Sequence, residues 1–401
     1  MTRAGGEPRL RRAALATALV FATNGFLLAS WVARLPATRD RLGAGTAELG
    51  LALLAPGFGS LLSMPFSGSW CRRLGSRAVV AATTLASSLG LVVLAVVPSM
   101  AALGAVLFVW GSSYGSWDVA MNVHGSAVEQ RAGREWMPRY HACWSVGGIA
   151  GAGCGALAAQ AGLSPLPHFA AVAVACVALV AVGLRSFVED RDPAAAAAAT
   201  RRPGRGKRGR VLTTRLLLVG AVTVCATTIE GAAADWLALL FTDERGASDS
   251  LAAAGYAVFA VAMAAGRFSG TAVAERLGRD GAVRAGGLVS FTGVLLTVLG
   301  PGLASAYLGA ALWALGVCLV FPAAVSAGGE APDRPADAIA AVTTIGYGGF
   351  LIGPPLIGVL AERVGLDRAL LVLLVLAAGI AVLAPAVRAR RPRPAASGAG
   401  P

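Results

Sequence analysis

Acidic side chains inside long apolar stretches are the residues of this sequence best suited to chemistry. Asp118 lies in the middle of the apolar run around Tyr114-Gly-Ser-Trp-Asp118-Val-Ala-Met-Asn122. A charged side chain at the centre of a bilayer costs about 2.5–3.5 kcal/mol on insertion scales, so such residues usually face a polar cavity. Because desolvation favours the neutral form of a carboxyl group, Asp118 is a candidate for proton exchange. The alternative is a permanent structural bond to an arginine or a neighbouring helix.

The residues around Asp118 predict a polar helix face. Positions three and four apart share one side of a helix, and this spacing aligns Gly111, Tyr114, Asp118, Asn122 and Gly125. The face carries small side chains and one aromatic ring. We therefore predict that Tyr114 and Asn122 belong to a substrate cavity beside Asp118.

A second apolar run carries two acids, Glu230 and Asp235. They are five residues apart, about 140° around a helix, so they cannot face the same point. Glu230 lies deeper in the run and is a second candidate for proton coupling. Asp235 lies nearer the end, where it is either a further coupling residue or an interfacial gate residue.

Polar and aromatic residues in other apolar runs are candidates for the same cavity. Asn24 and Trp31 are seven residues apart, hence on one helix face, and are candidate substrate contacts. The alternative for Trp31 is an interfacial anchor at the end of its helix. Tyr347 is a candidate cavity aromatic, in a run where Gly353-Pro-Pro355 predicts a broken or bent helix. His141 is expected to be a hydrogen-bonded interfacial residue, with pH sensing as the alternative. Arg267 is expected to be structural, either snorkelling toward the membrane surface or pairing with an acid such as Glu330.

Signatures of enzymes are missing from this sequence. It has no Gly-x-Ser-x-Gly, no Walker loop and no His-Glu-x-x-His, and its single lysine is Lys207, which excludes a P-loop ATPase. Its three histidines lack acids or cysteines at ligand spacing, and its six cysteines are scattered through apolar stretches. We therefore predict no enzymatic activity, no cofactor and no metal. Any transport must draw its energy from a gradient or an external partner.

The composition sets the environment of these residues. The chain of 401 residues is 56% hydrophobic and 14% charged, with a mean hydropathy of +0.69, whereas soluble proteins are about 25% charged. Runs of about 20 apolar residues predict membrane-spanning helices. Twelve are expected, near Ala13–Arg34, Ala47–Trp70, Ala78–Val97, Ala101–Ala127, Tyr140–Ala161, Pro167–Phe187, Thr213–Phe241, Leu251–Val273, Ala285–Leu299, Ala306–Gly328, Ala338–Ala361 and Arg368–Val387.

A charged segment rich in Pro, Gly and Ala divides these helices into two groups of six. We expect an N-terminal bundle over residues 1–187, a cytoplasmic linker over 188–212, a C-terminal bundle over 213–387 and a cytoplasmic tail over 388–401. Most arginines fall on the loops of the linker side, which by the positive-inside rule places both termini in the cytoplasm of a cell inner (plasma) membrane protein. The net charge of +13 therefore reflects topology and headgroup attraction, and we expect no nucleic-acid partner.

The two halves repeat one another. A shift of about 203 residues brings Arg73-Leu-Gly75 onto Arg276-Leu-Gly278, and the same shift brings Gly155-Ala-Leu-Ala158 onto Gly358-Val-Leu-Ala361. Parallel repeats of six helices, with substrate held between them near mid-membrane, are the plan of major facilitator transporters.

The loop after the second apolar run carries a family resemblance. It reads Gly68-Ser-Trp-Cys-Arg-Arg-Leu-Gly-Ser-Arg77 and resembles the major facilitator signature Gly-x-x-x-Asp-Arg-x-Gly-Arg-Arg, whose loop acts as a cytoplasmic latch. Arg72 stands where the family has Asp, whereas the second copy keeps an acid. Residues implied as gating loops are Arg73, Gly75, Glu275, Arg276 and Gly278. The alternative is that these basic residues only fix topology.

An acid followed four residues later by Asn in the fourth helix is similar to the fucose-permease branch of this superfamily, which are sugar:proton symporters. There the acid is a protonation site that faces the sugar cavity, which implies that role for Asp118 and, more weakly, a cavity position for Asn122. The branch also has an acid in its first helix after a Gly-Phe pair. This chain has Gly25-Phe26 without that acid, so a sugar substrate does not follow.

The sequence predicts an all-α membrane protein with the major facilitator fold of two six-helix bundles. We expect a secondary transporter that moves a small solute by alternating access, coupled to protons, and acts as a monomer in the lipid bilayer. The alternatives are a drug or metabolite:proton antiporter that works as an exporter, and a non-transporting membrane sensor on the same fold.

Overall fold

The computed structural model describes residues 3–44, 46–190, 213–247, 249–332 and 334–389. Over these residues the secondary structure is helical, with no strand. The predicted linker and tail fall mainly on residues 191–212 and 390–401, which lie outside the described residues.

In the described residues of the first half, the chain forms eight helices. Six of them are long and two are short, the short ones being α2 and α3. Their bounds are α1 (Arg3–Val32), α2 (Leu35–Leu42), α3 (Thr46–Ala52), α4 (Ala55–Leu74), α5 (Ser76–Leu94), α6 (Met100–Ala132), α7 (Met137–Gln160) and α8 (Pro165–Leu184).

The second half repeats this arrangement with more interruptions. Its elements are α10 (Thr214–Leu239), the π-helical η1 (Leu240–Glu244), α11 (Asp249–Leu277), α12 (Arg279–Leu299), α13 (Gly302–Val317), α14 (Val320–Gly329), α15 (Pro335–Val364), α16 (Leu366–Leu370), α17 (Val372–Leu383) and the 3₁₀-helical η2 (Ala384–Val387).

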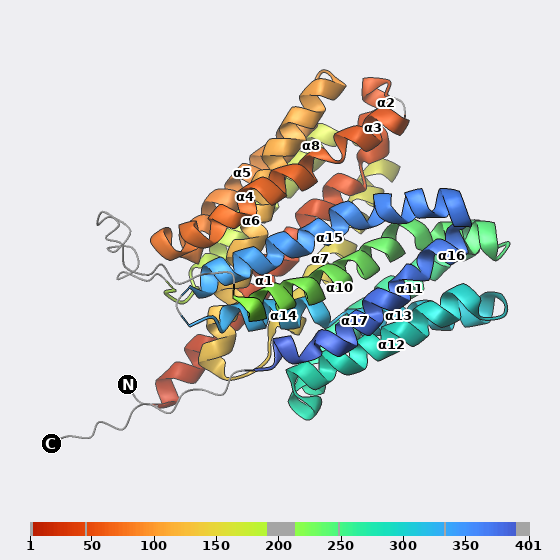
Figure 1. Cartoon of the computed structure of the whole chain (residues 1–401). Helices are drawn as coiled ribbons and strands as arrows, with labels where there is room; N and C mark the ends of the chain where they lie inside the picture. The colour runs from red at the N-terminus through yellow and green to blue at the C-terminus, as the bar shows by residue number, and fades with distance from the viewer. Residues whose placement is uncertain (1–2, 45, 191–212, 248, 333, 390–401) are drawn as a thin grey trace, which may run out of the picture.

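Each predicted apolar run lies on one helix or on two or three consecutive ones. Among the described residues, ten spans are long and apolar enough to cross a membrane. Helices α4 and α6 run beside them (Figure 1) but are less apolar, because they carry many Ser and Gly residues and Asp118. This is an all-α, multi-pass membrane protein, and its helices are consistent with the twelve expected spans.

The prediction of a broken or bent helix near residues 353–355 is not matched by a break. Helix α15 is continuous across Pro354. Threonine hydroxyls of the adjacent α10 bond to α15 before this point: Thr227 donates to the Gly346 carbonyl at 2.8 Å and Thr228 to the Gly349 carbonyl at 3.4 Å. The interruption in this half lies instead between α13 and α14, at residues 318–319.

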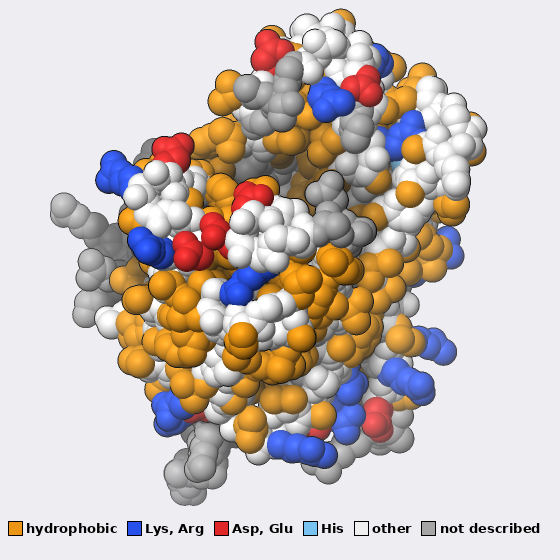
Figure 2. Space-filling model, turned by 90° about the vertical axis from the view of Figure 1, so that its right-hand side faces the viewer, with side chains coloured by type: hydrophobic (Ala, Val, Ile, Leu, Met, Phe, Trp, Pro, Cys, Tyr) orange, Lys and Arg blue, Asp and Glu red, His pale blue; other side chains and the backbone are white. Residues whose placement is uncertain are grey.

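The buried hydrophobic side chains form two clusters, one drawn mainly from each half of the chain. The halves meet where α4 packs on α15 and α7 packs on α11, and Figure 1 shows α15 lying between the two groups of helices. Many large apolar side chains stay exposed, such as Val174 at 71% and Val382 at 74%. Hydrophobic side chains also cover much of the face in Figure 2, as expected for a surface in contact with lipid.

We name the two ends of the helices by what lies there. The terminal face is the end at which α1 begins and η2 ends, and the opposite face is the end that carries α2, α3 and α16 (Figure 1). At the terminal face, α4 turns into α5 at Gly75 and α11 turns into α12 at Gly278. Both glycines have positive φ, 83° and 72°, which side chains with a Cβ rarely adopt.

Candidate substrate cavity and ion-pair gate

A cavity of about 970 Å³ lies between the two halves. Its walls come from α1, α4 and α6 on one side and from α10 and α15 on the other, and it extends to the opposite face, at Leu54 and Glu362. Its lining is rich in aromatic rings, including Trp31, Tyr114, Trp144, Trp236, Tyr347 and Phe350. Asp235 and Glu362 are its charged lining residues, so among the described residues no arginine or lysine faces it.

Four of the predicted site residues line this cavity directly: Trp31, Tyr114, Asp235 and Tyr347. The other four are not among its lining residues: Asn24, Asp118, Asn122 and Glu230. The cavity is therefore more aromatic, and its predicted acids more deeply placed, than the sequence indicated.

Asp118 lies directly beneath the cavity floor. Its carboxyl group accepts a hydrogen bond from Nδ2 of Asn122 at 3.2 Å and interacts with the hydroxyl of Tyr347, which belongs to the other half of the chain. Asn122 Oδ1 in turn lies 3.2 Å from Nε2 of His141. These four side chains form a continuous polar file from the cavity floor into the protein.

Glu230 belongs to a second arm of the same polar cluster. Its carboxylate pairs with Arg267 at 2.9 Å, and Arg267 also donates to the hydroxyl of Ser145 at 2.9 Å. Ser145 donates to the carbonyl of His141, one turn earlier on α7. The cluster therefore connects Asp118 to Glu230 across the interface between the halves.

The expected pairing of Arg267 with Glu330 is wrong. Arg267 is ten residues from the end of α11, about 15 Å along the helix, whereas Glu330 follows α14 at the terminal face. Arg267 therefore pairs with Glu230 inside the protein, and Glu330 pairs with Arg279 and Arg215.

Asn24 joins the cavity wall through a tryptophan that sequence reasoning did not assign to the site. The indole nitrogen of Trp144 donates to Asn24 Oδ1 at 2.9 Å and to the Tyr114 hydroxyl at 3.4 Å. The spacing of Trp144, three residues after His141, was the available signal, because it places both on one side of α7.

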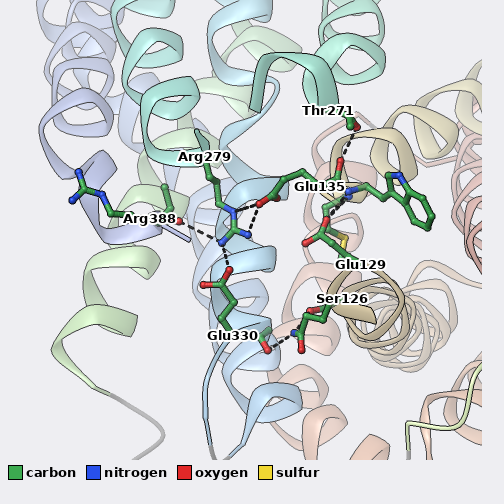
Figure 3. A network of polar contacts seen from close by, with 12 residues as sticks. Ser126, Glu129, Glu135, Thr271, Arg279, Glu330 and Arg388 are labelled. Carbon is green, nitrogen blue, oxygen red and sulfur yellow. Dashed lines mark hydrogen bonds and ion pairs between the residues drawn. The ribbon is translucent and has the colours of Figure 1, made fainter. Parts of the chain in front are cut away.

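At the terminal face the halves are held together by ion pairs (Figure 3). Arg279 on α12 pairs with Glu135 at 2.6 Å and with Glu330 at 2.8 Å. The Glu135 carbonyl also accepts from the Thr271 hydroxyl at 2.6 Å. Because Glu135 lies between α6 and α7, whereas Thr271 and Arg279 belong to the second half, these contacts close the interface opposite the cavity mouth.

A second closing contact joins α4 to α15. Arg72 forms an ion pair with Asp337 in the first turn of α15, and Arg334 pairs with the same carboxylate at 2.5 Å. Side chains of α15 near this point, Ala336 and Ile339, are buried in the hydrophobic cluster of the first half. We call the contacts of Arg72, Glu135, Arg279 and Asp337 the terminal gate.

The predicted gating loops flank this gate. Gly75 and Gly278 form its two turns, as described above. Arg73, Glu275 and Arg276 are exposed, and among the described residues they form no ion pair. The contacts are made by their neighbours, because Arg72 and Arg279 are the residues whose helix faces point toward the other half.

A cavity between two bundles, open at one face and fastened at the other, defines the class of helical membrane proteins that transport by alternating access. Residues 13–354 match the model of the Major Facilitator Superfamily, and the chain belongs to this family. It is a secondary transporter, and neither its family nor its fold is that of an enzyme.

Relatives extend along most of the chain. It is 33% identical over 88% of its length to an uncharacterised MFS-type transporter of Yersinia pestis, of which it covers 90%. It is 33% identical over 92% of its length to an uncharacterised transporter of Sinorhizobium fredii, covering 96% of that protein. It is 29% identical over 93% of its length to the membrane protein MosC of Rhizobium meliloti, covering 89%.

Solved structures share the fold. The transporter FucP in its outward conformation superimposes with a TM-score of 0.75 at 16% identity, over 94% of this chain and 99% of that one. The human organic anion transporter MFSD10 superimposes with a TM-score of 0.72 at 17% identity, over the same shares of the two chains. At these identities the likeness concerns the fold alone.

Proposed function

We propose that this transporter couples the movement of a small polar solute to protons, and that Asp118 is the principal proton site. The observation that carries the proposal is the position of Asp118, a buried acid of the first half that interacts with Tyr347, a cavity residue of the second half. An acid in contact with both the cavity floor and the opposite bundle is placed to exchange protons and to respond to substrate.

The interaction of Asp118 with Tyr347 also supplies a coupling mechanism. Hydrogen bonds to an ionised carboxylate are roughly twice as strong as neutral ones. Protonation of Asp118 therefore weakens its bond to Tyr347 and loosens the contact of α6 with α15. The Arg267–Glu230 pair, joined to the same cluster, is the second coupling element of the proposal.

The charges of the cavity favour an uncharged or cationic solute. Asp235 and Glu362 face the cavity, and no basic side chain among the described residues offsets them. Aromatic rings can stack on the apolar faces of polyols or attract a cation. An anion would meet repulsion without a compensating partner.

A second candidate is antiport of an amphiphile, as in an exporter. The observation that favours it is the large apolar share of the lining, in which Leu53, Leu54 and Leu351 accompany the aromatic rings. Under this alternative the solute leaves the cell as a proton enters through the same cluster.

We further propose that the terminal face is cytoplasmic, in a plasma (inner) membrane, and that the transporter works as a monomer whose moving units are residues 1–187 and 213–387. The arginine-rich loops support the orientation, and the two hydrophobic clusters support the units. With this orientation the structure is outward-facing.

The test uses the full chain reconstituted in vesicles that contain a pH-sensitive dye, screened with sugars, polyols and quaternary amines. A coupled solute should drive proton flux in one direction. Asp118→Asn should abolish this flux and leave solute counterflow intact. Glu275→Gln, which removes an exposed acid, is the matched control and should behave as the wild type. Unchanged coupling in Asp118→Asn would reject the assignment.

A further inference from the structure

A groove separate from the substrate cavity lies at the terminal face. Its volume is about 740 Å³, and it is bounded by α1, by the turn between α6 and α7, and by α11. Arginines line one end, namely Arg11, Arg131, Arg134 and Arg139. Apolar side chains line the rest, among them Leu15, Ala18 and Phe268.

Most of the positive charge at the basic end of the groove is not neutralised by ion pairs within the described part of the chain. Arg11, Arg134 and Arg139 are exposed and, within the described part of the chain, form no ion pair. Arg131 is partly engaged, because it donates to the carbonyl of Glu189. The one acid that lines the groove is Glu7, so the end remains strongly positive.

The apolar part leads from this basic end toward the hydrocarbon. Leu15 is one helical turn beyond Arg11 on α1, about 6 Å deeper, and is 64% exposed. Phe268 is nine residues from the terminal end of α11, about 13 Å deep, and is 49% exposed. Trp136 and Tyr140 also line the groove, and amphipathic rings of this kind suit the headgroup level.

We propose that the groove binds one anionic phospholipid of the adjoining leaflet. Its phosphate lies among Arg11, Arg134 and Arg139, and an acyl chain lies along Leu15 and Phe268. The positive charge and the apolar lining together favour this occupant. A free anion would make no contact with the apolar part of the groove, and a lipid without net charge would not neutralise the arginines.

The position of the groove gives the bound lipid a role in the transport cycle. It contacts α1 and α7 of one half and Phe268 of the other, three residues from Thr271, whose hydroxyl bonds Glu135. Beside Phe268, α11 approaches α7 so closely that a Cβ at Gly270 would lie 2.6 Å from Pro138. A lipid that spans both halves here stabilises the closed terminal gate.

The test is native mass spectrometry of the delipidated full chain in detergent, with phosphatidylglycerol, phosphatidylcholine or inorganic phosphate added. One phosphatidylglycerol should be retained in preference to phosphatidylcholine. Each basic residue near a membrane surface contributes to the binding free energy of an anionic lipid. Arg134→Gln and Arg139→Gln should therefore each weaken the binding of phosphatidylglycerol about fivefold. The matched control is the Arg77→Gln, Arg185→Gln pair, which removes two exposed arginines outside the groove and should leave binding unchanged.

Three results would overturn the proposal: equal retention of both lipids, equal losses in the control pair, or displacement of the lipid by millimolar phosphate. Brominated acyl chains on phosphatidylglycerol give an independent readout of position. They should quench the fluorescence of Trp136, so Trp136→Phe should lose a measurable part of the quenching seen in the wild type. Identical quenching in both would count against this site.

Discussion

At the scale of single residues, the chemistry of this transporter rests on groups that touch the other half of the chain. The sequence predicted which acids are unusual, because a carboxyl in an apolar run is visible without a structure. It did not predict their partners. Tyr347 is more than two hundred residues from Asp118, and the Arg267–Glu230 pair was missed because nothing in the spacing along one helix reveals which neighbour faces it.

Removing the hydroxyl of Tyr347 should uncouple transport while sparing the fold. Hydrogen bonds to charged groups contribute about 1.5–3 kcal/mol, so Tyr347→Phe should slow proton-driven uptake roughly 10- to 100-fold. Substrate counterflow should fall much less. The measurement is proton flux against counterflow in vesicles, and equal losses in both would show that Tyr347 serves substrate binding rather than coupling.

The Arg267–Glu230 pair should contribute to stability. The Arg267 side chain is only 6% exposed, and breaking a buried pair costs about 3 kcal/mol at the low end of the usual range. We therefore expect Arg267→Gln to lower the unfolding temperature clearly in detergent. Arg267→Gln combined with Glu230→Gln should recover much of the loss, because no buried charge is left without a partner. A double variant no more stable than the single one would contradict this account.

At the scale of helices, hydrophobic run length predicted the spans well, because backbone groups in lipid must bond within their own segment. The helix ends differ by several residues, since polar terminal turns extend beyond the hydrocarbon. The continuity of α15 could not be predicted, because a Gly-Pro-Pro sequence is typical of a break and its tolerance depends on packing against neighbouring helices. The short α2 also escaped notice, because it lacks an apolar run.

Close contact between α4 and α15 should depend on Gly68. A Cβ at this position would lie 2.5 Å from the Ala336 carbonyl oxygen, so Gly68→Val should force the two helices apart at the terminal gate. Cys71, one turn away and 2% exposed, then becomes accessible. In a variant that keeps Cys71 as its only cysteine, maleimide labelling should accelerate at least tenfold. This rate increase corresponds to a decrease of roughly 1.4 kcal/mol in the free energy of opening.

The control for this substitution is Gly104→Val, because a Cβ at Gly104 meets nothing within 4 Å. It should leave the labelling rate of Cys71 unchanged. Slow labelling in Gly68→Val, equal to that of the control, would mean that α4 and α15 tolerate the added side chain without separating.

At the scale of the whole molecule, the internal repeat predicted two similar bundles with a site between them. It did not predict which face is closed, because closure depends on contacts such as Glu135 with Arg279 that join segments with no repeat relationship. The arginine at position 72 illustrates the same limit. Arg72 stands where the family signature has an aspartate, yet it forms the gate contact with Asp337.

Glu135 should hold the gate shut. Glu135→Gln removes the charge that pairs with Arg279, and at about 1.5–3 kcal/mol the ratio of closed to open molecules should fall roughly 10- to 100-fold. Spin labels at positions 77 and 276, one in each half, should then report a new population at longer distance. Glu244→Gln, which removes an exposed acid away from the gate, should give the wild-type distribution. An unchanged distribution in Glu135→Gln would assign closure to other contacts.

Ion pairs between charged side chains hold the terminal face closed. Access to the cavity from the opposite face is therefore sensitive to the solution that bathes the terminal face. Dissolved ions screen such attractions over about 10 Å at 0.1 M salt and about 3 Å at 1 M, and Glu135 keeps 21% of its side chain in contact with solvent. The two acids that line the cavity, Asp235 and Glu362, form no ion pair with any described residue. Ionic composition in one compartment thus biases how long the binding site stays open to the other.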